Sequence, residues 1–271
     1  MSGTPLDELD EDGKALNRSW AMVLRLSASI AVVSGVVWVA VSSLRELVHR
    51  SIEGLFLLST TPGWLGVASV LALMGAAAAL RGGVMRRQAW RHAVGDGVAI
   101  ARDRAHQVTL DEPWRQSLGI AGRKFVATLL TLGGGGSGGL EAPVVLIGES
   151  LGATLARMAR VDERAALRLA QLCGILAAVS TLLGAPFTAA LFTLELVHGD
   201  RIVYRKLAYA LWAAVIPYWL NTTLNGYRPL FTAPIHSPVY SLPEYGAAAL
   251  VAISISVPLA LGFGGVMRWS R

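Results

Sequence analysis

Long apolar runs constrain the fold of this sequence more than any other feature. The first run covers residues 20–47 and the second covers residues 64–83. A run of about 18 or more apolar residues is long enough to cross the hydrocarbon core of a bilayer as a helix. Only 15% of the residues are charged, against about 25% in a soluble domain. The chain is therefore predicted to be an all-α, multi-pass integral membrane protein.

The later apolar segments differ from these two runs in length and composition. Residues 119–138 form a third run that ends in glycines. Three shorter segments, rich in small residues and interrupted by Gly or Pro, cover residues 143–158, 166–183 and 186–198. Short segments persist at membrane depth only where protein or an aqueous cavity surrounds their ends, and in transporters they mark the binding site. We therefore expect short broken or re-entrant helices here.

The remaining residues set the expected boundaries. Residues 1–18 are rich in Asp and Glu and are expected to be a polar cytoplasmic tail, followed by a membrane domain over residues 19–271. Residues 48–63 are expected to link the first two spans, because they end in the turn sequence Thr-Thr-Pro-Gly. Two longer spans are expected at 205–224 and 244–267, each holding a proline that should kink it.

Basic residues gather between the apolar runs. The clusters are Arg81, Arg86, Arg87 and Arg91 after the second run, and Arg201, Arg205 and Lys206 further on. The positive-inside rule places both clusters and the N-terminus in the cytoplasm, which predicts a multi-pass protein of the cell membrane. No basic patch interleaved with aromatic residues occurs, so nucleic acid is not an expected partner.

No metal centre or cofactor is expected. The single cysteine, Cys173, permits neither an internal disulfide nor a thiolate cluster. It is interpreted as a small apolar residue in a helix interface. The histidines show no ligand spacing with Cys or carboxylates.

One glycine-rich segment carries most of the functional information. Residues 133–148 read GGGGSGGLEAPVVLIG. The glycines let the backbone turn tightly and approach an ion, and Pro143 is expected to be the first residue of a helix. Glu141 and Ala142 then lie just before a helix N-terminus, where free N–H groups and the positive dipole end attract anions.

Glu141 has two interpretations on the residues alone, and they have equal weight. It could act as an intramolecular plug that competes with an external anion and leaves when protonated, because ionisable residues in membrane segments are functional by default. Alternatively, its carboxylate only stabilises the start of the helix.

At this point the residues resemble the CLC family of chloride channels and chloride/proton antiporters. The family's gating glutamate lies in a G-x-E-G-P motif, and residues 139–143 here read Gly-Leu-Glu-Ala-Pro. Residues 173–197, CGILAAVSTLLGAPFTAALFTLELV, resemble the family's next helix pair. Residues 95–98, Gly-Asp-Gly-Val, fall where the family has Gly-Ser-Gly-Ile-Pro. The resemblance covers roughly residues 20–270.

The resemblance implies transport of chloride or a similar small monovalent anion, by a channel or by a proton-coupled antiporter gated by Glu141. It implies that two helices, starting near Gly97 and Pro143, point their N-termini at a shared anion site. The implied anion-binding residues are Gly95, Asp96, Gly97, Gly139, Leu140, Ala142, Pro143 and Val144. It also implies a homodimer in membrane lipid and no enzymatic activity.

The sequence departs from the family pattern at several positions and in length. Asp96 stands where the family has a chloride-binding serine, and a carboxylate repels an anion unless it is protonated. Leu196 occupies the place of the inner proton glutamate of many antiporters, which leaves Glu195 as a second acid candidate. The chain matches the first of two inverted repeats and about one helix of the second. A second chain that completes the fold, or an inactive or truncated membrane subunit, is therefore an alternative.

A remote alternative is an intramembrane serine protease. Residues 135–138, Gly-Gly-Ser-Gly, read as the G-x-S-G of rhomboid-type enzymes, with Ser137 as nucleophile. That chemistry needs a histidine in a later span to accept the serine proton. The later histidines, His198 and His236, are expected outside the spans.

Overall fold

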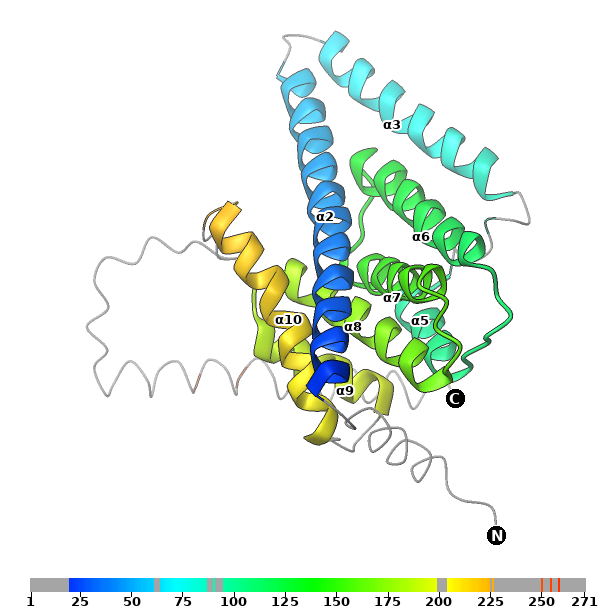
Figure 1. Cartoon of the computed structure of the whole chain (residues 1–271). Helices are drawn as coiled ribbons and strands as arrows, with labels where there is room; N and C mark the ends of the chain where they lie inside the picture. Colours follow the sequence, from blue (N-terminus) through cyan, green and yellow to red (C-terminus); the bar gives the residue numbers. More distant parts are fainter. Residues whose placement is uncertain are drawn as a thin grey trace. The chain divides into compact units, whose positions relative to one another are not determined.

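The computed structural model describes residues 20–60, 64–86, 90, 95–198, 204–224 and 226, with three isolated positions near the end of the chain. Every regular element within these residues is a helix, as expected (Figure 1). The elements are α2 (Trp20–Ser59), α3 (Trp64–Met85), α5 (Gly97–His106), α6 (Trp114–Thr128), the π-helix η2 (Leu129–Gly133), α7 (Glu141–Met158), α8 (Arg164–Leu183), α9 (Pro186–His198) and α10 (Tyr204–Leu224). All lie in a compact unit of residues 1–230. The tail at 1–18 and the expected span at 244–267 fall outside the described ranges.

Three of the described helices, α2, α3 and α8, are long and apolar enough to cross a membrane. Their mean hydropathies are 1.9, 1.7 and 1.7, and α9 is a shorter apolar helix. Large apolar side chains such as Leu65 and Leu71 of α3 remain more than half exposed. Such a surface suits a lipid environment and not water. The chain is an all-α, multi-pass membrane protein.

Helix α2 is longer than the sequence predicted. The expected link over residues 48–63 is wrong for its first part, because α2 continues to Ser59. Two pairs of side chains spaced four residues apart support this extension: Arg50 Nε lies 2.7 Å from Glu46 Oε1, and His49 Nε2 lies 3.1 Å from Glu53 Oε1. The helix ends just before the Thr-Thr-Pro-Gly sequence, so that signal marks the end of α2 correctly.

Helices α7 and α8 cross at very short range, and α8 is buried over much of its length. A β-carbon on Gly148 would overlap the carbonyl of Gly174, and one on Gly174 would overlap the carbonyl of Gly148. A β-carbon on Gly152 would likewise overlap the carbonyl of Ala170. This is the small-residue packing of membrane helices, which lets backbones approach closely. Cys173 is fully buried beside this crossing, as the sequence predicted.

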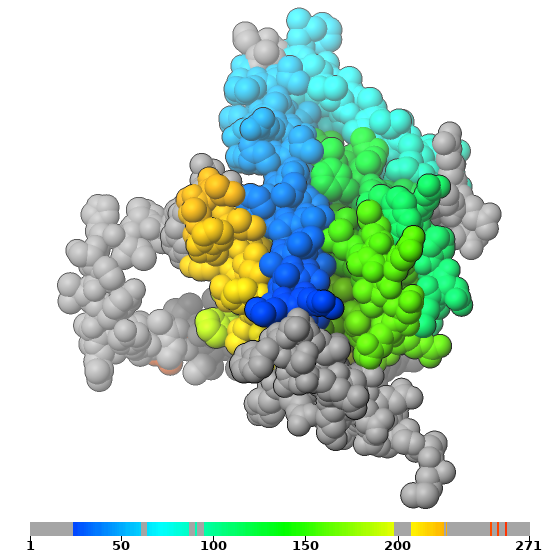
Figure 2. Space-filling view, in the orientation of Figure 1, coloured from blue at the N-terminus to red at the C-terminus, as the bar shows by residue number. Residues whose placement is uncertain are grey.

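Helix α10 contains Pro217 and continues through it. A proline has no N–H, so the carbonyl of Ala213, four residues earlier, loses its helical partner. The hydroxyl of Ser34 on α2 donates to this carbonyl at 3.1 Å, and Ser180 on α8 donates to the carbonyl of Ala214. Two neighbouring helices thus satisfy the acceptors that the proline disturbs. In Figure 2, α2 (blue) runs along the visible face, with α10 (yellow to orange) on one side and the green segments of α6 and α7 on the other.

Candidate anion site

Between α6 and α7 the backbone follows an unusual path, through the glycine segment (residues 133–140). Helix α6 passes into a π-helical turn that ends at Gly133. Such turns concentrate at functional sites. Gly135 follows with φ +83°, a conformation that side chains strongly disfavour, and the N–H of Gly136 donates to Thr131 O at 2.8 Å. The glycines therefore let the chain leave α6 and reach the start of α7 within a few residues.

Helix α7 begins earlier than predicted. Leu140 is its N-cap and Glu141 its first residue, so Pro143 is the third residue and not the first. Proline is tolerated there because the first-turn N–H groups have no helical acceptor. The Glu141 side chain is exposed and folds back over Gly139, where a β-carbon would overlap its carboxylate. Glu141 thus lies inside the first turn, and its carboxylate lies against the glycine segment.

Helix α5 begins at Gly97, with Asp96 as its N-cap. One carboxylate oxygen of Asp96, Oδ1, accepts a hydrogen bond from Val98 N at 3.0 Å. Asp96 therefore holds the end of its own helix, which is the usual position and role of an N-cap aspartate. Whether this carboxylate also faces an anion stays a prediction, and the geometry shows that Oδ1 caps α5.

Helices α5 and α7 run in the same direction, side by side, from a common start. A β-carbon on Gly97 would overlap the carbonyl of Ala142. Seven residues further along each helix, Arg104 Nε lies 3.0 Å from Glu149 Oε2. Two contacts with the same offset mean that the helices are parallel. Their positive dipole ends therefore adjoin, which creates a local positive potential.

At the start of α7, fewer backbone N–H groups are free to bind an anion than the sequence indicated. Val144 N already donates to Leu140 O at 3.0 Å, and Pro143 has no N–H. The amides of Leu140, Glu141 and Ala142 have no acceptor within α7. Of the residues predicted to bind the anion, Val144 and Pro143 therefore contribute no donor. Gly95 supplies its carbonyl to Lys124 Nζ of α6 at 2.8 Å, which ties the start of α5 to α6.

A groove of about 680 Å³ opens beside the start of α7, between the second half of α2 and the glycine segment. We call it the Glu141 groove. Its lining includes Glu141, residues 136–140, Asn221 of α10, and Arg45 and His49 of α2. Glu141, for which the sequence suggested a gating role, therefore faces open space and not packed protein.

Other sequence-predicted residues lie elsewhere. Glu195, the second acid candidate, is exposed on α9 and does not line the Glu141 groove. Ser137 lines the groove but makes no hydrogen bond to a histidine within the described residues. His198 ends α9, and His236 lies outside the described part of the chain. Within the described ranges, no later histidine is bonded to Ser137, so these residues give no support to the protease alternative.

A charge network that joins α7 from Glu149 onward to α5 and the start of α6 was missed by the sequence reasoning. It consists of Glu149, Arg104, Glu112 and Arg157, which alternate in sign. Arg104 bridges Glu149 and Glu112, and Arg157 Nη2 lies 2.9 Å from Glu112 Oε2. Glu149 is fully buried and also accepts from Gln171 Nε2 of α8 at 2.7 Å. The sequence signal was Glu149 itself, an acid within an apolar helix.

Comparison with known proteins agrees with this geometry. A model of the voltage-gated chloride channel family matches residues 74–270. The chain belongs to this family. A search of curated proteins finds no match. Among solved structures, the chain is similar to the X-ray structure of a slow cyanobacterial Cl⁻/H⁺ antiporter, with 19% sequence identity and a TM-score of 0.63. The similarity covers 90% of this chain but 58% of the antiporter chain.

The family assignment confirms the resemblance found in the sequence. The matched residues run from within α3 through the glycine segment, α7 and α10 to residue 270. The structural similarity shows that these helices share the antiporter's fold. The chain spans somewhat more than half the length of that structure.

Proposed function

We propose that this chain carries a pathway for chloride, or a similar small monovalent anion, across the membrane, with Glu141 as its gate. The observation that carries the proposal is the shared start of α5 and α7, where Gly97 packs against Ala142. Two positive helix ends adjoin there, and Glu141 lines the adjacent groove. An anion is favoured at such a place without a lysine or arginine in direct contact.

The proposed gating follows from competition at one helix end. The ionised carboxylate of Glu141 is attracted to the N-terminus of α7, as an external anion is. Protonation removes that attraction, so the side chain can leave and chloride can take its place. Anion passage should then increase as the pH falls, because the neutral form of Glu141 becomes more populated.

The test is chloride efflux from liposomes that contain the purified chain. The wild type should conduct faster at acid pH. Glu141→Gln should remove this pH dependence, because its amide resembles the protonated acid. The matched control is Glu195→Gln, an exposed acid away from the groove, which should behave as the wild type. An unchanged pH dependence in Glu141→Gln would refute the gate.

We further propose that chloride movement is weakly coupled to protons or uncoupled. Leu196 is apolar, and Glu195 is exposed on α9 and does not line the Glu141 groove. A chloride gradient across the liposomes should therefore move few protons. A pH electrode measures this directly. Proton uptake in a fixed ratio to chloride would contradict weak coupling while leaving the anion pathway intact.

A second candidate is a membrane subunit that does not conduct alone. Asp96 favours it, because its carboxylate already occupies the end of α5 that would otherwise attract an anion. A homodimer or a complementing second chain would then be the active form. No efflux from well-folded protein, restored on co-reconstitution with a partner, would support this alternative.

We propose the cell membrane as the location, with the N-terminus in the cytoplasm. The basis is the placement of basic residues at the end of α3 and just after it. Of these, Arg81 lies near the end of α3 and Arg86 follows the helix. Cysteine accessibility labelling at either end of α3 tests this orientation.

A further inference from the structure

The second half of α2 carries a cluster of ionisable residues, here called the charged band. Its members are Arg45, Glu46, His49, Arg50 and Glu53. Leu44 and Val48 turn toward the core, so at about 3.6 residues per turn the charged band falls on the outward face of the helix. Four of the five side chains are between 53% and 72% exposed. The exposed residues Val39 and Phe56, before and after the charged band, are apolar.

The depth of the charged band follows from its position beside α3. Helix α3 has 22 residues, or about 33 Å, which is just enough to cross a hydrocarbon core of about 30 Å. Leu73 and Ala77, in the middle of α3, line a groove of about 400 Å³ together with Arg50 and Ser51 of α2. The charged band therefore lies near the centre of the bilayer. Charged side chains at that depth face the interior of a protein or a water-filled cavity, because hydrocarbon is too costly for them.

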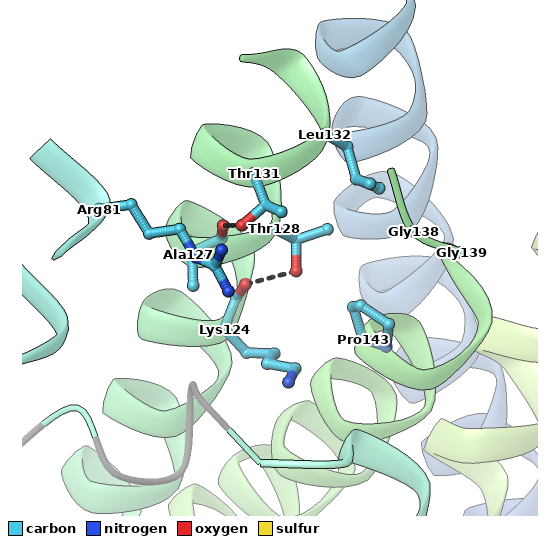
Figure 3. A pocket seen from close by; sticks show the side chains of 9 residues that line it. All are labelled: Arg81, Lys124, Ala127, Thr128, Thr131, Leu132, Gly138, Gly139 and Pro143. Carbon is cyan, nitrogen blue, oxygen red and sulfur yellow. Dashed lines mark hydrogen bonds between the residues drawn. The ribbon is translucent and has the colours of Figure 1, made fainter. Parts of the chain in front are cut away.

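The charged band and the glycine segment form two walls of the Glu141 groove. Arg45 and His49 line the groove from α2, and residues 136–140 line it from the other wall. Figure 3 shows the glycine segment from the side of α6, where Gly138 and Gly139 run between Leu132 and Pro143. These two glycines have no side chain to contribute to the groove. Among the described residues, the charge that lines the groove therefore comes from Glu141 and from the charged band.

Arg45 differs from the rest of the charged band in its partners. Glu46 pairs with Arg50 at 2.7 Å, and His49 lies 3.1 Å from Glu53. Arg45 makes no ion pair with any described residue and is partly buried at the groove. A cation held in a cleft with low-dielectric walls raises the local concentration of anions. The guanidinium of Arg45 is therefore placed to attract anions into the groove that Glu141 lines.

We propose that the charged band is one wall of a water-filled vestibule that leads to Glu141, and that Arg45 attracts small anions into this vestibule. Exposed charges near the bilayer centre require a polar medium, and the Glu141 groove of about 680 Å³ has room for water. The vestibule does not require Glu141 to be a gate. That chloride passes onward from the vestibule across the membrane rests on the proposed function.

Thiol labelling in liposomes tests whether water reaches the charged band. Cys173 is the only cysteine and is buried, so an introduced cysteine is the reactive one. His49→Cys should react with a charged methanethiosulfonate, which does not enter hydrocarbon. Leu71→Cys is the control, because Leu71 is 63% exposed on α3 and lies two residues from Leu73. It should stay unlabelled. If His49→Cys folds, as circular dichroism reports, and is equally unlabelled, hydrocarbon or another chain covers the charged band and the vestibule is refuted.

The charge of the reagent tests Arg45. In His49→Cys, the labelling rate of the anionic sulfonatoethyl reagent is divided by that of the cationic trimethylammonioethyl reagent. Adding Arg45→Gln should lower this ratio severalfold, because the attracting charge is lost, and Arg45→Lys should preserve it. The difference should shrink in 1 M salt, where the screening length is about 3 Å. A ratio that Arg45→Gln leaves unchanged would overturn the role of Arg45.

Chloride itself is followed by the excess ³⁵Cl NMR linewidth of the purified chain in neutral detergent. At low ionic strength, Arg45→Gln should weaken chloride binding severalfold and Arg45→Lys should not. Equal binding in Arg45→Gln and wild type would mean that Arg45 attracts no chloride. The proposals remain separable: a labelled vestibule with efflux indifferent to Glu141 refutes only the gate. Efflux that depends on Glu141, with no labelling at residue 49, refutes only the vestibule.

Discussion

The start and the middle of α7 treat their acidic residues in opposite ways. At the start of the helix, Glu141 is exposed and makes no ion pair with a described residue. Two turns later, Glu149 is fully buried and bonded to Arg104, Ser150 and Gln171. The same residue type is thus left exposed beside a groove at the first position and fixed inside the protein at the second. The Glu141 side chain therefore has room to move or to bind a proton, whereas Glu149 holds neighbouring helices together.

The two positions depend on each other through the alignment of α5 along α7. The ion pair between Arg104 and Glu149 fixes the position of α5 along α7. Seven residues earlier on each helix, the contact of Gly97 with Ala142 has the same register. Parallel neighbouring helices place like dipole ends together, which is unfavourable. The buried ion pair offsets that repulsion and keeps both N-termini at one level. Damage to the network should therefore reach the anion site indirectly.

Removing the buried acid should have the largest effect on stability. Glu149→Leu deprives Arg104 of one of its two carboxylates and Gln171 of its acceptor. Breaking one partner of a buried ion pair costs about 3–5 kcal/mol. Unfolding in detergent, followed by circular dichroism, should show this loss. Glu195→Leu on the exposed face of α9 is the control and should change little. Equal stability of the two variants would contradict a structural role for the network.

Crowding the shared helix start should have the next largest effect. Gly97→Ala places a methyl group where the Ala142 carbonyl lies, and overpacking costs up to about 3 kcal/mol. The separation of the two N-termini should also weaken chloride binding, measured by the ³⁵Cl linewidth. Gly122→Ala is the matched control, because no atom lies within 4 Å of its β-carbon. It should be neutral or slightly stabilising. If both variants bind chloride alike, the adjoining helix ends are not the site.

The sequence predicted the helical class, most helix positions and the tight backbone turn of the glycine segment, because these follow from local patterns. Apolar runs, prolines and glycines each determine the backbone conformation of only the few residues around them. The extension of α2 was missed because a polar stretch, including Arg50, was interpreted as a link. The charge network was missed for a different reason. Arg104 and Glu149 lie 45 residues apart, so only the packing of α5 against α7 reveals the pair.

The exact start of α7 shows a third reason why the sequence did not predict every detail of the structure. Proline favours the first helical position, but it fits anywhere in the first turn, where N–H groups have no helical acceptor. The local pattern therefore located the helix start only within about a turn. That shift matters for the site, because it moves Glu141 from the loop into the helix and removes Val144 from the available donors.

Substitution of Asp96 should change stability least. It also tests most directly how the start of α5 differs from the start of α7. Asp96→Ser should leave stability within about 0.5 kcal/mol, because serine and aspartate cap helices about equally well. It removes a negative charge at the start of α5, next to the start of α7, so chloride binding should tighten severalfold by ³⁵Cl linewidth. Asp103→Ser, an exposed acid further along α5, is the charge-matched control. If the two variants bind chloride equally, the effect is one of net charge, and Asp96 only caps its helix. If Asp96→Ser alone tightens binding and also raises efflux, the Asp96 carboxylate limits anion access in the native chain. Because this carboxylate also caps α5, it can limit access without making the fold less stable.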